Sequence, residues 1–327
     1  MKNEAKSANT MTCQACGVDC QRFGKHRNGL RRFRCPQCKK TYTEPHTRTL
    51  DTMYISEEKA VLAARLLLEG NSIRSTERIT NLDRNTIMRM LVLAGNRCLE
   101  LMDSQMRDLH CQHIQSDEIW TFVGKKQRQV RKDDPEELGD AWVFVAIDAE
   151  TKLIPAFTVG KRSAATTNAF VGDLAHRLAN RVQLTTDGFR FYIDAVEKHF
   201  GADVDFGQIV KLYGDYGQHD TAARYSPSPI VEVISKVRQG NPNPEHMSTS
   251  HVERQNLTMR MAIRRFTRLT NAFSKKLDNL KAACALHFAY YNFCRIHQTL
   301  RVTPAMEAGL TDHVWTLAEL LKPEHIQ

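Results

Sequence analysis

The stretch His113-Ile-Gln-Ser-Asp117-Glu-Ile-Trp-Thr-Phe-Val123 decides the predicted fold, because apolar and polar residues alternate along it. Alternation with a period of two is typical of a β-strand. Asp117 lies in the middle of this strand, where an ionised side chain is costly to bury without a partner. We therefore take this stretch as the first strand of a sheet, and Asp117 as a candidate functional residue.

Further strands and helices are expected after this strand, in a definite order. Strands are predicted at 141–147, 153–159, 182–186 and 208–213, and helices at 164–180 and in a segment ending at about His199. Three strands in a meander, then helix, strand, helix and strand, is the order of the ribonuclease H-like fold. The sequence therefore predicts an α/β catalytic core of this class, with a mixed sheet and helices on its faces.

The remainder of the chain is expected to be divided as follows. Residues 214–247 are predicted to be an insertion in the core with one strand at 230–237, and a long helix is expected from about Thr249. The stretch from Ala282 to Leu321 is expected to be largely helical, with Pro304 at the start of a late helix. The expected domains are a zinc ribbon (1–50), a helix-turn-helix with a linker helix (51–110), the catalytic core (111–300) and a helical tail (301–327).

Two CxxC turns lie near the amino terminus, Cys13-Gln-Ala-Cys16 and Cys35-Pro-Gln-Cys38, with 18 residues between them. Four thiolates in a tetrahedron are the ligand set that structural zinc prefers, and this spacing is typical of a zinc ribbon. We therefore predict one structural Zn²⁺. The alternative is a disordered basic tail with free thiols; Cys20 and His26 are rival ligands, but neither belongs to a paired turn. The candidate DNA-binding residues of the basic face are Arg31, Arg32, Arg34, Lys39 and Lys40.

A helical block follows the cysteines. Helices are predicted from Ser56 to about Glu69, at 73–79, and from Arg84 to about Leu109, with Asp83 as the cap of the third helix. A short helix, a tight turn and a helix with a polar start form a helix-turn-helix pattern. The alternative is a plain three-helix linker. The candidate residues for the DNA major groove are Arg84, Asn85, Thr86 and Arg89.

The charge of the chain is concentrated in two segments. The 327 residues carry a net charge of +9, with a pI of about 9.1, while residues 1–50 carry +8 and residues 254–281 carry +7. The remaining residues therefore carry −6. Two basic segments on a mildly acidic body are typical of a protein that binds nucleic acid at defined places.

Composition excludes several classes of protein. Hydrophobic residues make up 42% and charged residues 25% of the chain, which is ordinary for a globular protein of two or three domains and excludes a wholly disordered one. The first ten residues lack an apolar signal region, and no apolar run is long enough to span a bilayer. We expect a soluble, intracellular protein with reduced cysteines.

Three carboxylates stand out by their positions. Asp117 is in the first strand, Asp187 ends the fourth strand, and Glu253 lies in the first turn of the long helix. In the predicted fold the first and fourth strands are neighbours, so the three side chains can converge. Two Mg²⁺ or Mn²⁺ ions would neutralise them and could clamp a phosphodiester. Taken singly, Asp187 is also an ordinary turn residue, and Glu253 is an ordinary residue for the first turn of a helix. Two other acids are alternatives. Glu118 is expected to face the opposite side of the pleat, and Asp148 is most simply a turn residue.

The helix that begins near Thr249 carries further candidates. Glu253, Asn256 and Arg260 share one face. Arg264, Arg265 and Arg268 follow and are expected to contact DNA phosphates. One helix can thus hold a metal and direct the DNA backbone toward it.

The chain resembles the insertion sequence 1 family of DDE transposases. The resemblance is carried by three motifs around the acidic residues, and by a downstream stretch: SDEIWTFVGKK (116–126), TTDG (185–188), SHVERQNLTMR (250–260), YNFCRIH (291–297) and TPAM (303–306). The layout of zinc ribbon, helix-turn-helix and catalytic core also matches the family. One departure is the long insertion between Asp187 and Glu253.

The resemblance implies a Mg²⁺-dependent transposase that binds inverted-repeat DNA ends as a homodimer or larger multimer, cuts a strand and joins the 3′-OH to target DNA. It implies that Asp117 ligates both metal ions, that Asp187 and Glu253 each ligate mainly one, and that Arg260 positions the phosphate. It also implies a prokaryotic, nucleoid-associated protein in the cytoplasm. Two alternatives are a DNA-binding repressor with an inert core and a structure-selective nuclease of the same fold.

Overall fold

The computed structural model describes residues 11–26, 30–44, 50, 53–214, 229–267 and 270–322. The chain divides into two compact units, Met1–Ala60 and Val61–Gln327. Part of the predicted insertion (215–228), Arg268 and the last five residues of the predicted tail lie outside the described residues. Within the described part of the chain, no helix is both long and apolar enough to cross a membrane.

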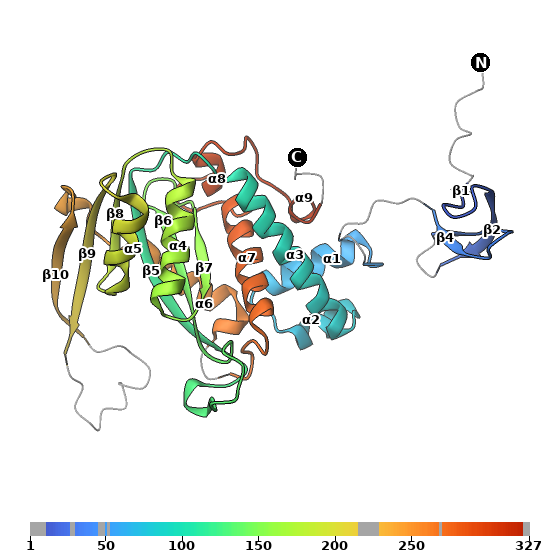
Figure 1. Cartoon of the computed structure of the whole chain (residues 1–327), viewed down its shortest axis with the longest axis horizontal. Helices are drawn as coiled ribbons and strands as arrows, with labels where there is room; N and C mark the ends of the chain where they lie inside the picture. The colour runs from blue at the N-terminus through green and yellow to red at the C-terminus, as the bar shows by residue number, and fades with distance from the viewer. Residues whose placement is uncertain are drawn as a thin grey trace, which may run out of the picture. The chain divides into compact units, whose positions relative to one another are not determined.

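The first unit contains a small antiparallel sheet in the order β1-β2-β3-β4 (Figure 1). Its strands are Met11–Thr12 (β1), Asp19–Lys25 (β2), Arg31–Arg34 (β3) and Thr41–Thr43 (β4). One CxxC turn joins β1 to β2 and the other joins β3 to β4. Phe33 is buried with Cys13, Cys20 and Cys35, so the cysteines themselves form most of this small core.

Three helices open the second part of the described chain: Glu57–Leu68 (α1), Ile73–Thr80 (α2) and Arg84–Gln105 (α3). The Ser72 hydroxyl accepts a hydrogen bond from the Ser75 N–H and caps α2. Asn81 ends α2 in the left-handed conformation, at φ 55°. Asp83 caps α3, as predicted, since its carboxylate accepts from the Asn85 N–H at 2.8 Å. The tight turn between two helices is therefore present.

A six-stranded mixed sheet forms the centre of the second unit, in the order β10-β9-β8-β5-β6-β7. Its strands are His113–Val123 (β5), Gly139–Asp148 (β6), Phe157–Gly160 (β7), Val182–Asp187 (β8), Val204–Tyr213 (β9) and Ile230–Gln239 (β10). β5, β6 and β7 form the antiparallel meander, and β8 and β9 run parallel to β5. The expected mixed sheet, with its first and fourth strands adjacent, is confirmed.

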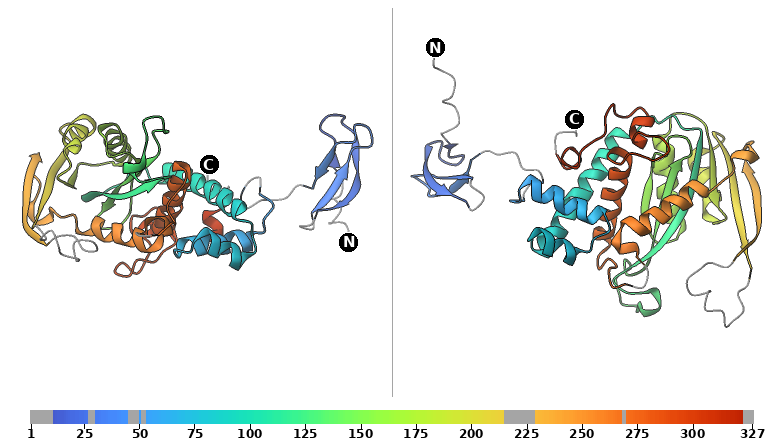
Figure 2. Two further views of the ribbon diagram at one scale, coloured as in Figure 1. Left: turned by 90° about the horizontal axis from the view of Figure 1, so that it is seen from below. Right: turned by 180° about the vertical axis from the view of Figure 1, so that it is seen from behind.

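Helices cover both faces of this sheet (Figure 2). The helices are Ala164–Arg177 (α4), Phe191–Phe200 (α5), Ser250–Ala262 (α6), Leu277–Phe293 (α7), Pro304–Glu307 (α8) and Leu317–Leu320 (α9). α4 and α5 lie on one face and α6 on the other. Short 3₁₀ turns lie at Gln127–Gln129, Pro244–His246 and Arg264–Phe266.

Two elements differ from the sequence expectation, and a third has a pairing partner that the sequence did not predict. β7 begins at Phe157 rather than at residue 153, because Pro155 has no N–H to donate to a ladder. The stretch after α7, expected to be largely helical, holds α8 and α9 joined by irregular backbone. The strand expected at 230–237 within the insertion is present as β10, and its pairing with β9 extends the sheet.

Candidate functional site

The three carboxylates singled out in the sequence line one cleft of about 650 Å³. Asp117 comes from β5, Asp187 from the end of β8, and Glu253 from the first turn of α6. Basic side chains share this cleft with them: Arg162, Arg190 and Lys211. The cleft therefore gathers acidic and basic groups from segments far apart in the sequence.

Backbone register brings the two aspartates together. In the parallel pairing of β5 with β8, Ser116 is opposite Thr186, so Asp117 and Asp187 are the next residues on adjacent strands. Gln115, which is also on β5, holds the start of α6 against this strand. Its Oε1 accepts hydrogen bonds from the N–H groups of His251 and Val252, at 2.8 and 3.4 Å. Glu253 follows directly after these two residues.

Asp117 lies in an environment that disfavours its ionised form. Burial, and then repulsion from Asp187, raise the pKa of Asp117 to about 6. The Asn256 side-chain amide opposes this shift by donating to Asp117 Oδ2 at 2.9 Å. Asn256, which was predicted to contact DNA, thus binds a carboxylate of the cleft.

Asp187 is held by the backbone and by one arginine. Its Oδ1 accepts from the Phe189 N–H at 3.0 Å, and its Oδ2 accepts from Arg162 Nη2 at 3.2 Å. Burial raises the pKa of Asp187 in spite of these partners. Arg162 also stacks on the Phe189 ring, with its guanidinium carbon 4.0 Å from the ring centroid, so the cation has a fixed position.

A fourth carboxylate, Glu118, lies near the aspartates. Oxygen atoms of Asp117, Glu118 and Asp187 all lie within 4.8 Å of one another. Arg162 joins Glu118 to Asp187, and Arg162 Nε donates to Glu118 Oε2 at 3.1 Å. Burial, then repulsion from Asp187, raise the pKa of Glu118 to about 8. From the sequence, Glu118 was considered only as an alternative to Asp117, and Arg162 was not predicted. The two adjacent acids in a buried strand were a signal that could have indicated Glu118.

Glu253 lines the cleft without belonging to that close cluster. Its Oε1 accepts from the Thr249 hydroxyl at 2.6 Å and forms an ion pair with Lys211 on β9. Arg260, predicted to position a phosphate, is not among the described residues that line this cleft. Lys211 and Thr249 had no distinguishing signal in the sequence, because only the folded chain brings them to Glu253.

The donor set fits a divalent cation. Carboxylate oxygens are the ligands that Mg²⁺ and Mn²⁺ prefer. Burial raises the pKa of Asp117, Glu118 and Asp187, and repulsion from Asp187 adds to the shift of the other two, so a cation at this cluster would relieve unfavourable charge. Asp117, Glu118 and Asp187 lie close enough to hold a cation, and Glu253 lines the same cleft.

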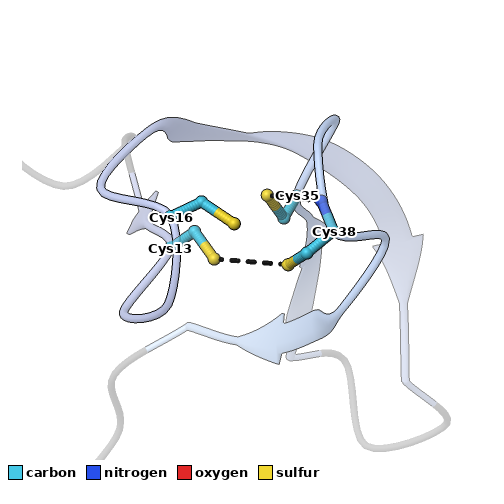
Figure 3. Close-up of side chains that lie close together, drawn as sticks. All are labelled: Cys13, Cys16, Cys35 and Cys38. Carbon is cyan, nitrogen blue, oxygen red and sulfur yellow. Dashed lines mark hydrogen bonds between the residues drawn. The ribbon is translucent and has the colours of Figure 1, made fainter.

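The four cysteines of the CxxC turns face one another (Figure 3). Their sulfur atoms lie within 4.8 Å of one another, and Cys13 Sγ is 3.6 Å from Cys38 Sγ. A zinc tetrahedron with bonds of 2.3 Å would have edges of about 3.8 Å. A hydrogen bond from Tyr42 lowers the pKa of Cys13 to about 6, which favours the thiolate. The rival Cys20 is a buried core residue, and His26 bonds Thr43 at 2.9 Å.

The basic residues of the first unit are arranged around an aromatic ring. Arg32 and Arg34 lie over Phe23, with guanidinium carbons 5.2 and 5.0 Å from the ring centroid. Arg31 forms a long ion pair with Glu44, and Lys39 and Lys40 are exposed beyond β3. An exposed ring between two guanidinium groups suits a phosphate-bearing partner.

A second cavity, of about 700 Å³, joins two predicted DNA-binding segments. Arg84 of α3 lines it together with Arg264 and Arg265, which follow α6. Arg74 and Lys275 add further positive charge, and no acidic residue is among the described lining residues. Asn85, Thr86 and Arg89 do not line this cavity. Burial lowers the pKa of Arg265, whose Nη1 donates to the Ser274 hydroxyl at 3.0 Å.

Comparisons with known proteins give similarity at the level of structure. No family model and no curated protein sequence matches the chain. A piggyBac transposase synaptic complex with hairpin DNA is 10% identical, with a TM-score of 0.36, over 83% of this chain and 72% of that one. A Mos1 transposase paired-end complex with left transposon end is 13% identical, with a TM-score of 0.20, over 49% of this chain and 60% of that one. The Mos1 strand transfer complex is 13% identical, with a TM-score of 0.19, over 76% of this chain and 79% of that one. Such low values establish neither family nor function, so the resemblance to the insertion sequence 1 family stays a prediction.

Proposed function

We propose that the chain is a metal-dependent DNA transposase of the DDE type, with Asp117, Asp187 and Glu253 as its catalytic carboxylates. The observation that carries the proposal is their convergence in one cleft from two parallel strands and a helix.

The arrangement of the sheet supports a ribonuclease H-like core. The meander β5-β6-β7 is followed by β8 and β9, both parallel to β5 and placed on its other side. This is the strand order that the sequence predicted for that fold. β10 is an addition at the far edge of the sheet.

Two Mg²⁺ or Mn²⁺ ions fit the proposed chemistry, held by Asp117, Asp187 and Glu253. When bound, such ions polarise a phosphodiester and lower the pKa of an attacking hydroxyl. The chain itself contributes the orientation of the carboxylates: Asn256 holds Asp117, the Phe189 N–H and Arg162 hold Asp187, and Thr249 holds Glu253.

Cationic side chains provide the complementary part of the site. Arg162, Arg190 and Lys211 line the cleft and would attract the phosphates on either side of the reacting one. Lys211 would exchange its ion pair with Glu253 for a DNA phosphate. Catalysis by positioning and charge stabilisation requires no covalent nucleophile from the protein.

DNA recognition would be shared by the other predicted modules. The cysteine cluster would hold one structural Zn²⁺ in a zinc ribbon, and α2 and α3 would form a helix-turn-helix. The cavity lined by Arg84, Arg264 and Arg265 would seat a DNA backbone that runs between these segments. A homodimer or larger assembly in a prokaryotic nucleoid completes the proposal.

The test is a strand-transfer assay with the full-length protein. The substrate is a labelled DNA end from the terminal repeats that flank the gene, with a supercoiled plasmid as target, in Mg²⁺. We expect the end to be joined to the plasmid, and we expect Asp187→Asn to abolish joining while retaining end binding. Cleavage without joining would favour the nuclease, and binding without cleavage in any divalent ion would favour the repressor; either result would overturn the proposal.

A further inference from the structure

β10 is the outermost strand of the sheet, and its free edge carries exposed apolar side chains. One edge pairs with β9, and no strand in the described ranges pairs with the other. Val231, Val233 and Val237 are 72%, 53% and 59% exposed. Unpaired backbone groups beside exposed valines form a template for another strand, which soluble proteins normally block or use.

The charges on β10 decide which partner fits. Its pairing with β9 is regular from Glu232 to Val237, between two register shifts. Glu232 and Lys236 lie in this regular part, four residues apart and on the same face. Neither has an ion pair or a side-chain hydrogen bond in the structure as described. An acid and a base placed symmetrically about Ile234 suit a second copy of the same strand.

We propose that β10 pairs antiparallel with β10 of a second copy of this chain, about a two-fold axis at Ile234. Glu232 of each copy then faces Lys236 of the other, which gives two ion pairs by symmetry. Val233 of each copy becomes a diagonal cross-strand neighbour of Val237 of the other. The contact is isologous and closes on itself, so it gives a dimer rather than a fibre.

A competing register about Ser235 is less favourable. It would place Glu232 opposite Arg238, but Arg238 Nε already donates to Gln208 Oε1 at 2.9 Å. It would also place Lys236 opposite the apolar Ile234. Pairing about Ile234 leaves the Arg238 contact intact and matches both exposed charges.

Pairing at β10 would link two clefts through one continuous sheet. Opposite residues of an antiparallel pair point to the same side, so both copies present the face covered by α6 in the same direction. Five strand spacings separate the two β8 strands, roughly 24 Å along the hydrogen-bonding direction. This consequence rests on the proposed function, which requires two DNA ends to be processed together; the pairing itself does not.

The test exchanges the two charges, using the full-length zinc-loaded protein without DNA. Glu232→Lys and Lys236→Glu each create two like-charge contacts, so each variant alone is expected to dimerise more weakly, on the order of tenfold. An equimolar mixture of the two variants restores both ion pairs in the heterodimer and is expected to dimerise as the wild type does. The double variant Glu232→Lys/Lys236→Glu should also self-associate. Sedimentation equilibrium at micromolar concentrations measures all of these.

Matched controls carry the same charge changes on exposed residues of α3 and α7, Glu100→Lys and Lys281→Glu, and should leave the dimer unchanged. The mixing experiment excludes misfolding as an explanation, because a misfolded variant is not rescued by its partner. A monomeric wild type, single variants that dimerise normally, or a mixture that fails to associate would each overturn the proposal. DNA and the Mg²⁺ chemistry play no part in this assay, so its failure leaves the proposed catalytic activity of the carboxylates untouched.

Discussion

A neutral residue, Asn256, orients one of the carboxylates of the cleft, Asp117. Asn256 Nδ2 is 2.9 Å from Asp117 Oδ2, and the amide is buried between α6 and the sheet. A donor at this distance fixes the rotamer of the carboxylate. Residues that orient metal ligands in this way typically contribute 10–100-fold to affinity or activity.

We therefore expect Asn256→Ala to lower the Mg²⁺-dependent joining rate by roughly 10–100-fold without unfolding the protein. The measurement is a single-turnover joining assay over a titration of Mg²⁺, with thermal unfolding as a check on folding. Leu257→Ala, an exposed change on the same helix, is the control and should keep the wild-type rate. Equal rates for both variants would show that the Asn256 contact does not support the site.

His287 makes a prediction about pH and stability. It is buried in α7, neither ring nitrogen has a hydrogen-bond partner in the described structure, and burial lowers its pKa to about 3. The unfolded value is about 6.5, so below that pH the unfolded chain takes up a proton that the folded chain does not. This contribution to stability is complete above pH 6.5 and is lost as the pH falls toward 3.

Between pH 7 and pH 5 we expect wild type to lose about 2 kcal/mol more unfolding free energy than His287→Leu. Urea unfolding at the two pH values measures this difference, and the comparison within each protein removes the packing effect of the substitution. An identical pH dependence in the two proteins would contradict a neutral, buried His287.

At the scale of elements, the turn between α2 and α3 depends on one cap. The Asp83 carboxylate accepts a hydrogen bond from the Asn85 N–H and caps the start of α3, directly after the turn that follows α2. Removing such a cap typically costs about 1 kcal/mol. Asp83→Ala should therefore lower the unfolding free energy by about that amount, measured in urea. Asp278→Ala, which removes an acid from the first turn of α7 without removing a capping bond, should cost less.

The two CxxC turns have the same backbone hydrogen bonds, which supports a shared metal. Gly17 N–H donates to the Cys13 carbonyl, and Lys39 N–H donates to the Cys35 carbonyl, at 2.8 and 3.1 Å. Residues 17 and 39 both have positive φ, 68° and 62°. Each turn therefore presents its two sulfurs in the same way, toward the other turn.

Cys35→Ser should consequently reduce bound zinc from one equivalent to nearly none and should weaken end binding. Elemental analysis of the purified protein measures the metal. Cys20→Ser, which alters a buried cysteine outside the cluster, is the control and should retain one equivalent. Full zinc content in Cys35→Ser would contradict the predicted ligand set.

The order of these elements was largely predictable, because it depends on local patterns. Alternation gave the bounds of β5, and the capping residue Asp83 gave the start of α3. The features that were not predicted have non-local causes. The start of β7 depends on which neighbouring strand Pro155 would face, and the pairing of β10 with β9 depends on a partner distant in sequence.

At the scale of the molecule, the two basic segments differ in what the fold does with them. The first surrounds Phe23 in the amino-terminal unit. The second follows α6, so its residues Arg264 and Arg265 meet Arg84 in one cavity while Glu253, at the other end of the helix, meets the aspartates. The net charge of +9 therefore combines +15 in these two segments with −6 in the rest of the chain, which includes the carboxylates of the cleft.

Motif and topology indicated three carboxylates that line the cleft, Asp117, Asp187 and Glu253, but they did not indicate the clustering of Glu118 with the aspartates or the cations around them. Arg162, Lys211 and Glu118 reach the cleft through tertiary packing, which leaves no periodic signal in the sequence. Glu118 departs most from the sequence expectation. It was expected to face the opposite side of the pleat from Asp117, yet its carboxylate lies within 4.8 Å of both aspartates.

We propose that Glu253, and not Glu118, completes the carboxylate triad. Glu118 lies in the close cluster with Asp117 and Asp187 and is paired with Arg162, whereas Glu253 lines the same cleft and is paired with Lys211. Glu253 shares α6 with Asn256, which is bonded to Asp117. The most direct measurement compares Mg²⁺-dependent strand joining by Glu253→Gln and Glu118→Gln, both checked for folding and DNA binding. We predict that Glu253→Gln loses joining by roughly a thousandfold while Glu118→Gln retains it within about tenfold; joining that survives Glu253→Gln but disappears in Glu118→Gln would contradict the assignment.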